Sequence, residues 1–573
     1  MMRITRRAAA GAAVAGPVLW GAREGGWTEE WDRAALAAAL RSADARFHPT
    51  EQMLRSRVGP EYRYHSNLRN QEVHATRDSL EYALLLFEAK RDERGAAVLE
   101  RLLTLQDTDP ASKWYGIWGW YLEEPPPKMS PADWNWADFN GVTLLLIEHR
   151  HGARLDARLR ERVRTAIRHA AGSIRRRNVA MTYTNIAVKG TFVTLAAAEL
   201  LGDRPLFEYA KDRWRRFART LDETGSFAEY NSPTYARVTV TELSHMRTYW
   251  RDEESRVLAG KIEHRAWLHI ARHWFAPARQ WAGPHSRSYS TLLRSEIWLQ
   301  KGLDNALRFG ELESMPAAGD VSYVDFRCPR DLTPMFLDTP KPSLHRELFV
   351  TGVQGATYFD PKFCLGSVNR GDFWVQRRPV VAYWGTPDRP GYAHLRFVKD
   401  DYDFSSALIY TVQAGPFVLG LVNFRTPGGD RHISLDPIAN GTFAAKSLRL
   451  TLEVQGEAPF LEFSVRGGGL GGAPLRMTDP RTAELLAEPR TVKLAELTDA
   501  WAAFTLAMAG GAGEFHLDRD ESRVRLRWKT PAGELALEGA VKPAAVESLN
   551  AAFRDSIDGR PVPERRLSDE RLV

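Results

Sequence analysis

The sequence predicts a multidomain chain that is helical in its first part and built of β-strands in its second. Apolar residues recur at three- and four-residue steps through most of residues 29–315. Short β-branched and aromatic runs, separated by Gly, Pro and Asp, take over between residues 340 and 560. Prolines gather between residues 310 and 345, where the two patterns meet. We therefore expect an α/α array, open or closed into a toroid, followed by an antiparallel β-sandwich.

The N-terminus has the pattern of an export signal. Thr5-Arg6-Arg7 precedes a weakly apolar run, Ala8–Trp20, that is rich in Ala and Gly. A basic start before a short apolar run is typical of a secretory signal, and the paired arginines favour the twin-arginine type. We expect residues 1–25 to be this signal and the protein to be periplasmic or secreted, with an Ala-rich extension as the alternative. No stretch predicts a membrane span.

Individual elements follow from the same periodicities. We expect helices at 80–87, 96–103, 140–150, 157–177, 186–201, 205–220, 236–250, 253–275 and 290–308. We expect strands at 347–353, 373–376, 406–412, 417–422, 448–454 and 524–528. The C-terminal end is charged, and we expect it to be frayed.

Charge and composition narrow the class of partner. The net charge is +6 and the pI is about 9.1, which suits an acidic substrate or surface. No zinc finger or RNP box is present, so nucleic acid is a poor candidate. Cys328 and Cys364 lack the spacing of a metal site, and the sequence leaves open whether they pair. There is no P-loop, Rossmann glycine pattern, nucleophile elbow or His-Glu-x-x-His motif.

Aromatic residues are concentrated in the loops between residues 114 and 140. Trp118, Trp134 and Trp136 lie there among Gly, Pro and polar residues, together with Asp138. Flat aromatic rings suit the faces of sugars, so these residues are candidates for substrate binding. A small core beneath a long loop is the alternative.

The polar segment from Gly225 to Tyr235 is the first candidate for chemistry. Gly225 and Pro233 interrupt the helical pattern on both sides of Glu229 and Asn231, and Tyr235 stands where the next helix begins. A phenol acts as general acid or base if positive neighbours lower its pKa. The same residues also suit a helix start, with Asn231 or Ser232 as N-cap and Pro233 in the first turn.

A second polar block follows Gly283-Pro284. His285, Arg287 and Tyr289 lie within five residues of one another in an irregular loop. Histidine has a near-neutral pKa and is a candidate base. A histidine satisfied by backbone hydrogen bonds is the competing interpretation.

These motifs and the order of the two domains resemble the heparinase II/III-like lyases and, more distantly, the alginate and chondroitin AC lyases. The resemblance rests on Gly225-Ser226, Glu229, Ser232 and Tyr235, and on Asn185 at the start of helix 186–201. It implies a toroid and β-elimination at a uronic acid. In that reaction Asn185, helped by Arg287 or Arg237, neutralises the C5 carboxylate. A Tyr or His takes the C5 proton, and Tyr235 protonates the leaving oxygen.

The resemblance also implies that no cofactor is required, while a structural divalent cation is allowed, with Asp430, His432 and Asp436 as ligands. The sequence departs from the family pattern because Asn185 is followed by Ile and Tyr235 by Ala. A glycoside hydrolase using Glu229 and Asp138 is the second hypothesis. A non-catalytic glycan-binding protein is the third. The polymer, endo or exo action, and the oligomeric state are not specified by the sequence.

Overall fold

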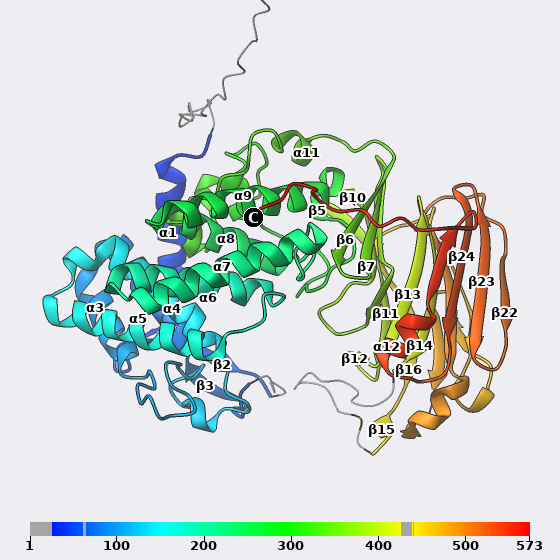
Figure 1. Cartoon of the computed structure of the whole chain (residues 1–573), viewed down its shortest axis with the longest axis horizontal. Coiled ribbons are helices and arrows are strands. Elements are labelled where there is room, and N and C mark those ends of the chain that lie inside the picture. Colours follow the sequence, from blue (N-terminus) through cyan, green and yellow to red (C-terminus); the bar gives the residue numbers. More distant parts are fainter. Residues whose placement is uncertain (1–25, 61–64, 426–437, 439, 487) are drawn as a thin grey trace, which may run out of the picture.

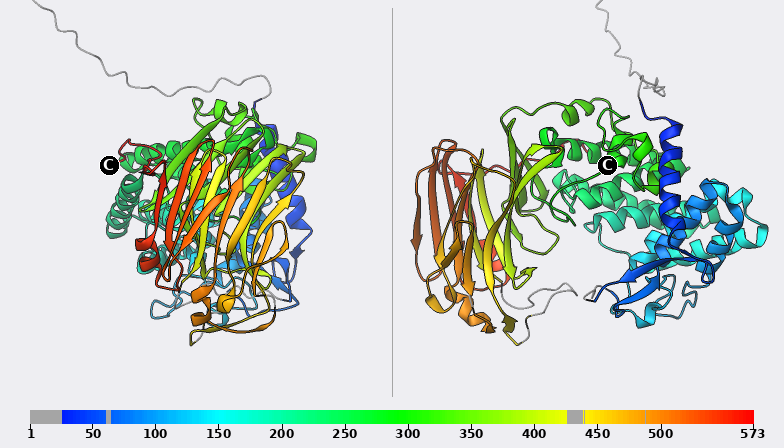
Figure 2. Two further views of the ribbon diagram at one scale, coloured as in Figure 1. Left: turned by 90° about the vertical axis from the view of Figure 1, so that its right-hand side faces the viewer. Right: turned by 180° about the vertical axis from the view of Figure 1, so that it is seen from behind.

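The computed structural model describes residues 26–573 except 61–64, 426–437, 439 and 487. The expected signal (1–25) and the suggested cation ligands Asp430, His432 and Asp436 lie outside the described residues. Helices form one side of the molecule and sheets the other (Figures 1 and 2). The predicted fold class, an α/α toroid followed by antiparallel sheets, is confirmed.

The helical part is built from consecutive helical hairpins. Within each hairpin the two helices contact each other, and the first helices of successive hairpins also contact one another. This places α2, α4, α6 and α8 in an inner row and their partners in an outer row. The hairpins follow α1 (Glu29–Asp44) and are α2 (Thr76–Glu88) with α3 (Asp92–Leu103), α4 (Asn135–His151) with α5 (Ala157–Arg177), α6 (Thr184–Leu201) with α7 (Arg204–Thr224), and α8 (Pro233–Tyr249) with α9 (Glu253–Arg272).

The sequences of the two rows differ as their positions require. In the inner helix α6 every residue from Thr184 to Ala198 is buried, and α4 is nearly as buried. The outer helices α5 and α7 instead carry one apolar stripe and a charged outer face. A helix covered on all sides must be apolar or small all round, whereas a surface helix needs only one apolar face.

Two parts of the helical domain differ from expectation. Residues 47–74 contain a three-stranded sheet, formed by β1 (Phe47–His48), β2 (Met53–Val58) and β3 (Gln71–His74). Residues 290–308 are mostly irregular and contain only the short α10 (Ile297–Gly302). Asp304 and Asn305 adopt φ of 52° and 60°, which ends that helix.

The sheets form three stacked layers. The layer next to the helices has nine strands: β6 (Ser343–Val350), β7 (Val353–Phe359), β8 (Phe363–Val368), β10 (Val380–Thr386), β11 (Arg389–Lys399), β12 (Tyr402–Asp403), β16 (Leu448–Gln455), β18 (Arg476–Asp479) and β19 (Thr482–Leu486). The middle layer has β9 (Arg370–Asp372), β13 (Ala407–Ala414), β14 (Phe417–Phe424), β17 (Glu462–Gly468) and β21 (Trp501–Ala507). The outer layer has β22 (Phe515–Arg519), β23 (Arg523–Thr530), β24 (Gly533–Ala540), β25 (Arg554–Ile557) and β26 (Arg560–Pro561).

The burial of each strand follows from its layer. In β13 and β14 every residue is buried, because alternate side chains enter the core shared with the nine-stranded sheet and the core shared with the outer sheet. In β23 buried and exposed residues alternate, because one face of that strand meets solvent. The third layer is therefore an addition to the predicted sandwich.

Two expected strands have a different structure. Residues 347–353 span the end of β6 and the turn into β7, with Gly352 at φ 75°. Residues 373–376 form a loop between β9 and β10. The Gln376 carbonyl accepts a hydrogen bond from the Ser288 N–H at 2.7 Å. This loop therefore pairs with the helical domain and not with a sheet.

The C-terminal residues return to the helices (Figure 1), so the prediction of a frayed end is wrong. The Leu572 N–H donates to the Asp222 carboxylate at 3.0 Å, and Arg272 donates to the Leu567 carbonyl at 2.9 Å. Cys328 and Cys364 are both buried and free. Among the described residues no helix has the length and apolar character needed to cross a membrane.

Candidate active site

The segment between α7 and α8 is held at both ends by helix caps. Gly225 ends α7 at φ 87°, a left-handed conformation that suits glycine. The Ser232 hydroxyl accepts the Tyr235 N–H at 3.0 Å, and Pro233 occupies the first turn of α8. Ser232 is thus the N-cap. The caps fix the positions from which Glu229 and Tyr235 extend.

The Glu229 carboxylate lies at the start of α6. It accepts the Asn185 backbone N–H at 2.7 Å and the Asn185 amide at 2.6 and 2.8 Å. Arg287 adds an ion pair at 3.0 Å. Glu229 and Arg287 are only 10% and 14% exposed, so this pair lies largely out of water, where charge-assisted hydrogen bonds are strong.

Arg287 connects the helical domain to the sheets. Its Nε donates to Gln376 Oε1 at 2.9 Å, and its guanidinium lies 4.0 Å from the ring centre of Tyr235 and 5.4 Å from that of Trp374. Burial disfavours the charge of Arg287, but Tyr235 and Glu229 more than offset it and raise the pKa of the guanidinium. Arg287 is therefore a fixed cation at the junction.

Tyr235 forms a pair of phenols with Tyr289. The two hydroxyl oxygens are 2.8 Å apart, and Tyr289 is 63% exposed, so the pair meets solvent. Burial raises the pKa of Tyr235 well above its ordinary value, although Arg287 favours the phenolate. The positive neighbour therefore does not lower the pKa of Tyr235, because desolvation outweighs the attraction of the guanidinium.

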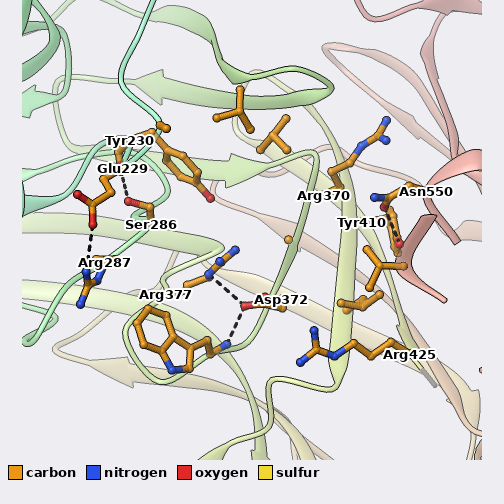
Figure 3. A pocket seen from close by; sticks show the side chains of 17 residues that line it. Glu229, Tyr230, Ser286, Arg287, Arg370, Asp372, Arg377, Tyr410, Arg425 and Asn550 are labelled. Atoms are coloured by element: carbon orange, nitrogen blue, oxygen red, sulfur yellow. Dashed lines mark hydrogen bonds and ion pairs between the residues drawn. The ribbon is translucent and has the colours of Figure 1, made fainter. Parts of the chain in front are cut away.

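A pocket of about 340 Å³ opens beside this cluster, between the helices and the sheets. Figure 3 shows Glu229 and Arg287 at one end and Arg370, Tyr410 and Asn550 at the other. Arg377, also in the lining, pairs with Asp372 at 3.1 Å. Its arginines outnumber its carboxylates, which suits an anionic ligand.

His285 and Asn231 lie near this cluster but face inward. His285 is 1% exposed, its Nε2 meets the Trp281 carbonyl at 2.9 Å, and burial lowers its pKa to about 3. The candidate base is thus a packed histidine. The Asn231 amide donates to the Ala282 carbonyl at 2.6 Å, and its oxygen accepts the Trp281 indole N–H. Asn231 therefore holds the loop in place, with its amide engaged by these contacts.

Asp138, Trp118, Trp134 and Trp136 do not line this pocket. Asp138 is 2% exposed and packs against Gly190, and burial raises its pKa to about 7. Trp118 is 1% exposed and donates its indole N–H to the Leu102 carbonyl at 2.9 Å, so it is a core residue. Trp134 and Trp136 are half-buried against the helical core. Trp136 stacks on Trp120 with ring centres 4.8 Å apart.

A second cavity, of about 580 Å³, lies among the inner helices. Its charges are already paired: Lys189 contacts Glu242, and Arg237 binds both oxygens of Asp320 at 2.6 and 2.7 Å. The guanidinium of Arg237 is thus held by Asp320. Of the two arginines, Arg287 shares a contact with Asn185, because both bind the Glu229 carboxylate.

The candidate catalytic residues all came from the helical half of the chain, whereas the structure also brings residues of the sheet domain to the pocket. Trp374 and Gln376 contact Arg287 from the loop after β9, and Arg370 and Arg377 line the pocket. The segment Phe373-Trp374-Val375-Gln376 has the composition of a strand, which concealed a loop. The adjoining Arg377-Arg378-Pro379 was the available signal, because Pro interrupts a ladder.

Comparisons with known proteins identify one matching family and several structures that are similar to this chain. A family described as a domain of unknown function, DUF8769, matches residues 48–322. The chain is similar to the chondroitin AC lyase of Streptomyces coelicolor A3 solved with chondroitin sulphate, at 11% identity over 89% of this chain and 84% of that chain, with a TM-score of 0.46. It is also similar to heparinase III, at 10% identity over 92% and 93%, with a TM-score of 0.40.

A reducing end xylose-releasing exo-oligoxylanase is similar at 13% identity over 44% of this chain and 75% of that chain, with a TM-score of 0.26. No curated protein matches this chain.

Proposed function

We propose that this protein is a polysaccharide lyase that cleaves a uronic-acid-containing glycan by β-elimination in the pocket beside Arg287. One observation carries the proposal. A buried guanidinium and the Asn185 amide together bind a carboxylate, that of Glu229, directly beside a pair of phenols. A lyase needs these two functions side by side, because it neutralises a sugar carboxylate and moves a proton next to it.

The donors that would receive the sugar carboxylate hold Glu229 in the unliganded protein. The C5 carboxylate competes with Glu229 for Asn185 and Arg287, so substrate binding turns the Glu229 side chain aside. Neutralising the C5 carboxylate lets the negative charge that develops on proton loss spread as an enolate. Glu229 thus keeps the donors oriented until substrate arrives.

Tyr235 carries the proton in both directions. As a phenolate it takes the C5 proton, the electrons of the C–H bond form the C4–C5 double bond, and the C4–O bond breaks. The leaving oxygen then receives the proton from Tyr235. Tyr289 donates a hydrogen bond to the phenolate, and Arg287 stabilises it electrostatically. No cofactor is required in this scheme.

The proposal is tested by a screen of uronic-acid polysaccharides, read by the ultraviolet absorbance of the unsaturated product. We expect Tyr235→Phe to reduce turnover by about 10²–10⁴-fold, the usual contribution of a proton-transfer group. Tyr402→Phe is the matched control, because Tyr402 is an exposed tyrosine on β12. Equal turnover of both variants would refute the role of Tyr235.

The hydrolase hypothesis has less support. It needs two carboxyl groups facing one cleft, and Asp138 is buried against α6 while Glu229 is bound by Asn185 and Arg287. A non-catalytic glycan-binding role remains the third hypothesis, and loss of turnover in Tyr235→Phe argues against it. Export by a signal in residues 1–25 stays a prediction.

A further inference from the structure

A second polar cluster contacts the inward-facing side of the segment that carries Glu229. His269 and His273 are one turn apart on α9, and His345 and Glu347 lie on the same side of β6. Ligand atoms of His269, His273 and Glu347 all lie within 4.8 Å of one another. His273 and Glu347 are 1% exposed and His345 is 24% exposed, so the cluster is closed on most sides.

Hydrogen bonds determine which atoms of the cluster carry lone pairs. The Asn231 N–H donates to His269 Nε2 at 2.9 Å, so the hydrogen of His269 is on Nδ1, which donates to Glu347 Oε1 at 2.7 Å. His273 Nδ1 donates to the His269 carbonyl at 2.9 Å, which leaves a lone pair on His273 Nε2. Both ring nitrogens of His269 are thus engaged in hydrogen bonds, whereas His273 keeps a lone pair on Nε2 that can bind a metal.

The remaining atoms converge without hydrogen bonds. Glu347 Oε2 lies 3.9 Å from His273 Nε2 and 3.8 Å from His345 Nε2. Among the described residues, neither Glu347 Oε2 nor His345 Nε2 has a hydrogen-bond partner. These distances exceed a hydrogen bond but are close to the roughly 3.3–3.7 Å between two ligands of one Zn²⁺ ion. A metal cation between them would satisfy the buried carboxylate oxygen and both imidazole nitrogens at once.

We propose that His273, His345 and Glu347 bind one divalent transition-metal ion, with zinc as the preferred metal. Two imidazole nitrogens, one carboxylate oxygen and a water molecule form a four-coordinate set that suits Zn²⁺. His269 and Ser226 are positioning residues, because both donate to Glu347 Oε1 and leave Oε2 turned toward the metal. These ligands differ from Asp430, His432 and Asp436.

The proposed site joins three parts of the chain. The ligands come from α9 and β6, while Ser226 and Asn231 connect the cluster to the segment that holds Glu229. Tyr230 of the same segment stacks on Phe349 of β6 with ring centres 4.0 Å apart. The metal therefore fastens the helical domain to the first sheet next to the pocket. This role does not depend on the proposed lyase reaction.

The test is metal content of the full chain after dialysis against Zn²⁺ and then metal-free buffer. We expect about one zinc per chain in the wild type, and at least a tenfold lower content in His345→Ala, whose partly exposed side chain makes loss of folding a small risk. His264→Ala, an exposed histidine on the same helix, is the matched control and keeps the zinc. Wild type without bound zinc would overturn the proposal.

Two further measurements test the site by means other than metal content. Binding of Co²⁺ should produce the intense visible absorption of a four-coordinate site, and a spectrum like that of aqueous cobalt would contradict the proposal. A chelator should lower the Tm of the wild type and leave that of His345→Ala unchanged. An equal shift in both proteins would place the metal elsewhere.

Discussion

The short segment from Gly225 to Tyr235 has two sets of polar side chains that differ in what they face. Glu229 and Tyr235 contact Arg287 beside the pocket between the helices and the sheets. Ser226 and Asn231 face inward, where Glu347, Trp281 and backbone groups satisfy them. Adjacent polar residues of one motif therefore serve different purposes. Substitutions in the first set should affect turnover, and those in the second should affect stability.

Arg287→Gln should have the largest effect among the groups around Tyr235. It removes the cation that contacts both the carboxylate site and the phenol, and we expect kcat/KM to fall by about 10²–10³-fold. Steady-state kinetics on the polysaccharide found in the screen would measure this. Arg294→Gln, exposed in the same loop, should leave kcat/KM unchanged. A decrease in kcat/KM of less than threefold in Arg287→Gln would show that Arg287 does not take part in the reaction.

The pH dependence tests the first set without a mutation. Burial raises the pKa of Tyr235, so the phenolate is a small fraction of the protein at neutral pH. As long as the pH stays below that pKa, this fraction increases about tenfold for each unit by which the pH is raised. We expect log kcat/KM to rise with a slope near one from neutral into alkaline pH. A bell-shaped profile with an acidic optimum would instead indicate two carboxyl groups.

Asn231→Ala tests the inward set. It leaves the Trp281 indole N–H and the carbonyls of Ala282 and Pro284 without their partner, so we expect a loss of about 2–4 kcal/mol in the free energy of unfolding. Urea denaturation measures it. Asn70→Ala is the matched control, because Asn70 has a similar positive φ but is exposed. Equal losses in the two variants would assign the effect to the backbone conformation alone.

Asp138→Asn tests one of the two carboxyl groups that the hydrolase hypothesis requires. The pKa of Asp138 is about 7 in the folded protein and 3.8 ordinarily, so stability present below pH 4 is lost as the pH rises through 7. The variant avoids this loss, and we expect it to be more stable than wild type by about 1–4 kcal/mol at pH 8 and equal near pH 4. We expect turnover to be unchanged in this variant. Loss of turnover would support the glycoside hydrolase hypothesis instead.

The periodicities of the sequence predicted the order of the domains because burial imposes them directly. Helices such as α5 and α6 match the expected 157–177 and 186–201 closely. The third layer of sheet was not predicted. The alternating pattern of β23 is the same in the outer sheet of a two-layer sandwich and in the outer sheet of a three-layer one. Residues 290–308 have helical composition, but most of that stretch is irregular between contacts to Arg279, Gln280 and the sheets.

The candidate site was predicted in part. Its members on the helical side (Asn185, Glu229, Tyr235, Arg287 and Tyr289) do contact one another, because each follows a helix break that leaves polar groups at one end of the array. Orientation was not predictable, which is why His285 and Asn231 were misplaced. The histidine cluster had a signal in His269-x-x-x-His273 and His345-x-Glu347, spacings that share a helix face and a strand face, but the two pairs meet only in the fold.

The most direct test of the central claim is to follow the cleavage of the polysaccharide in H₂¹⁸O and weigh the products by mass spectrometry. A lyase adds no water across the bond it breaks, so the account predicts an unsaturated product that carries no ¹⁸O at the cleavage site. Saturated products that contain one ¹⁸O for each bond cleaved would contradict it.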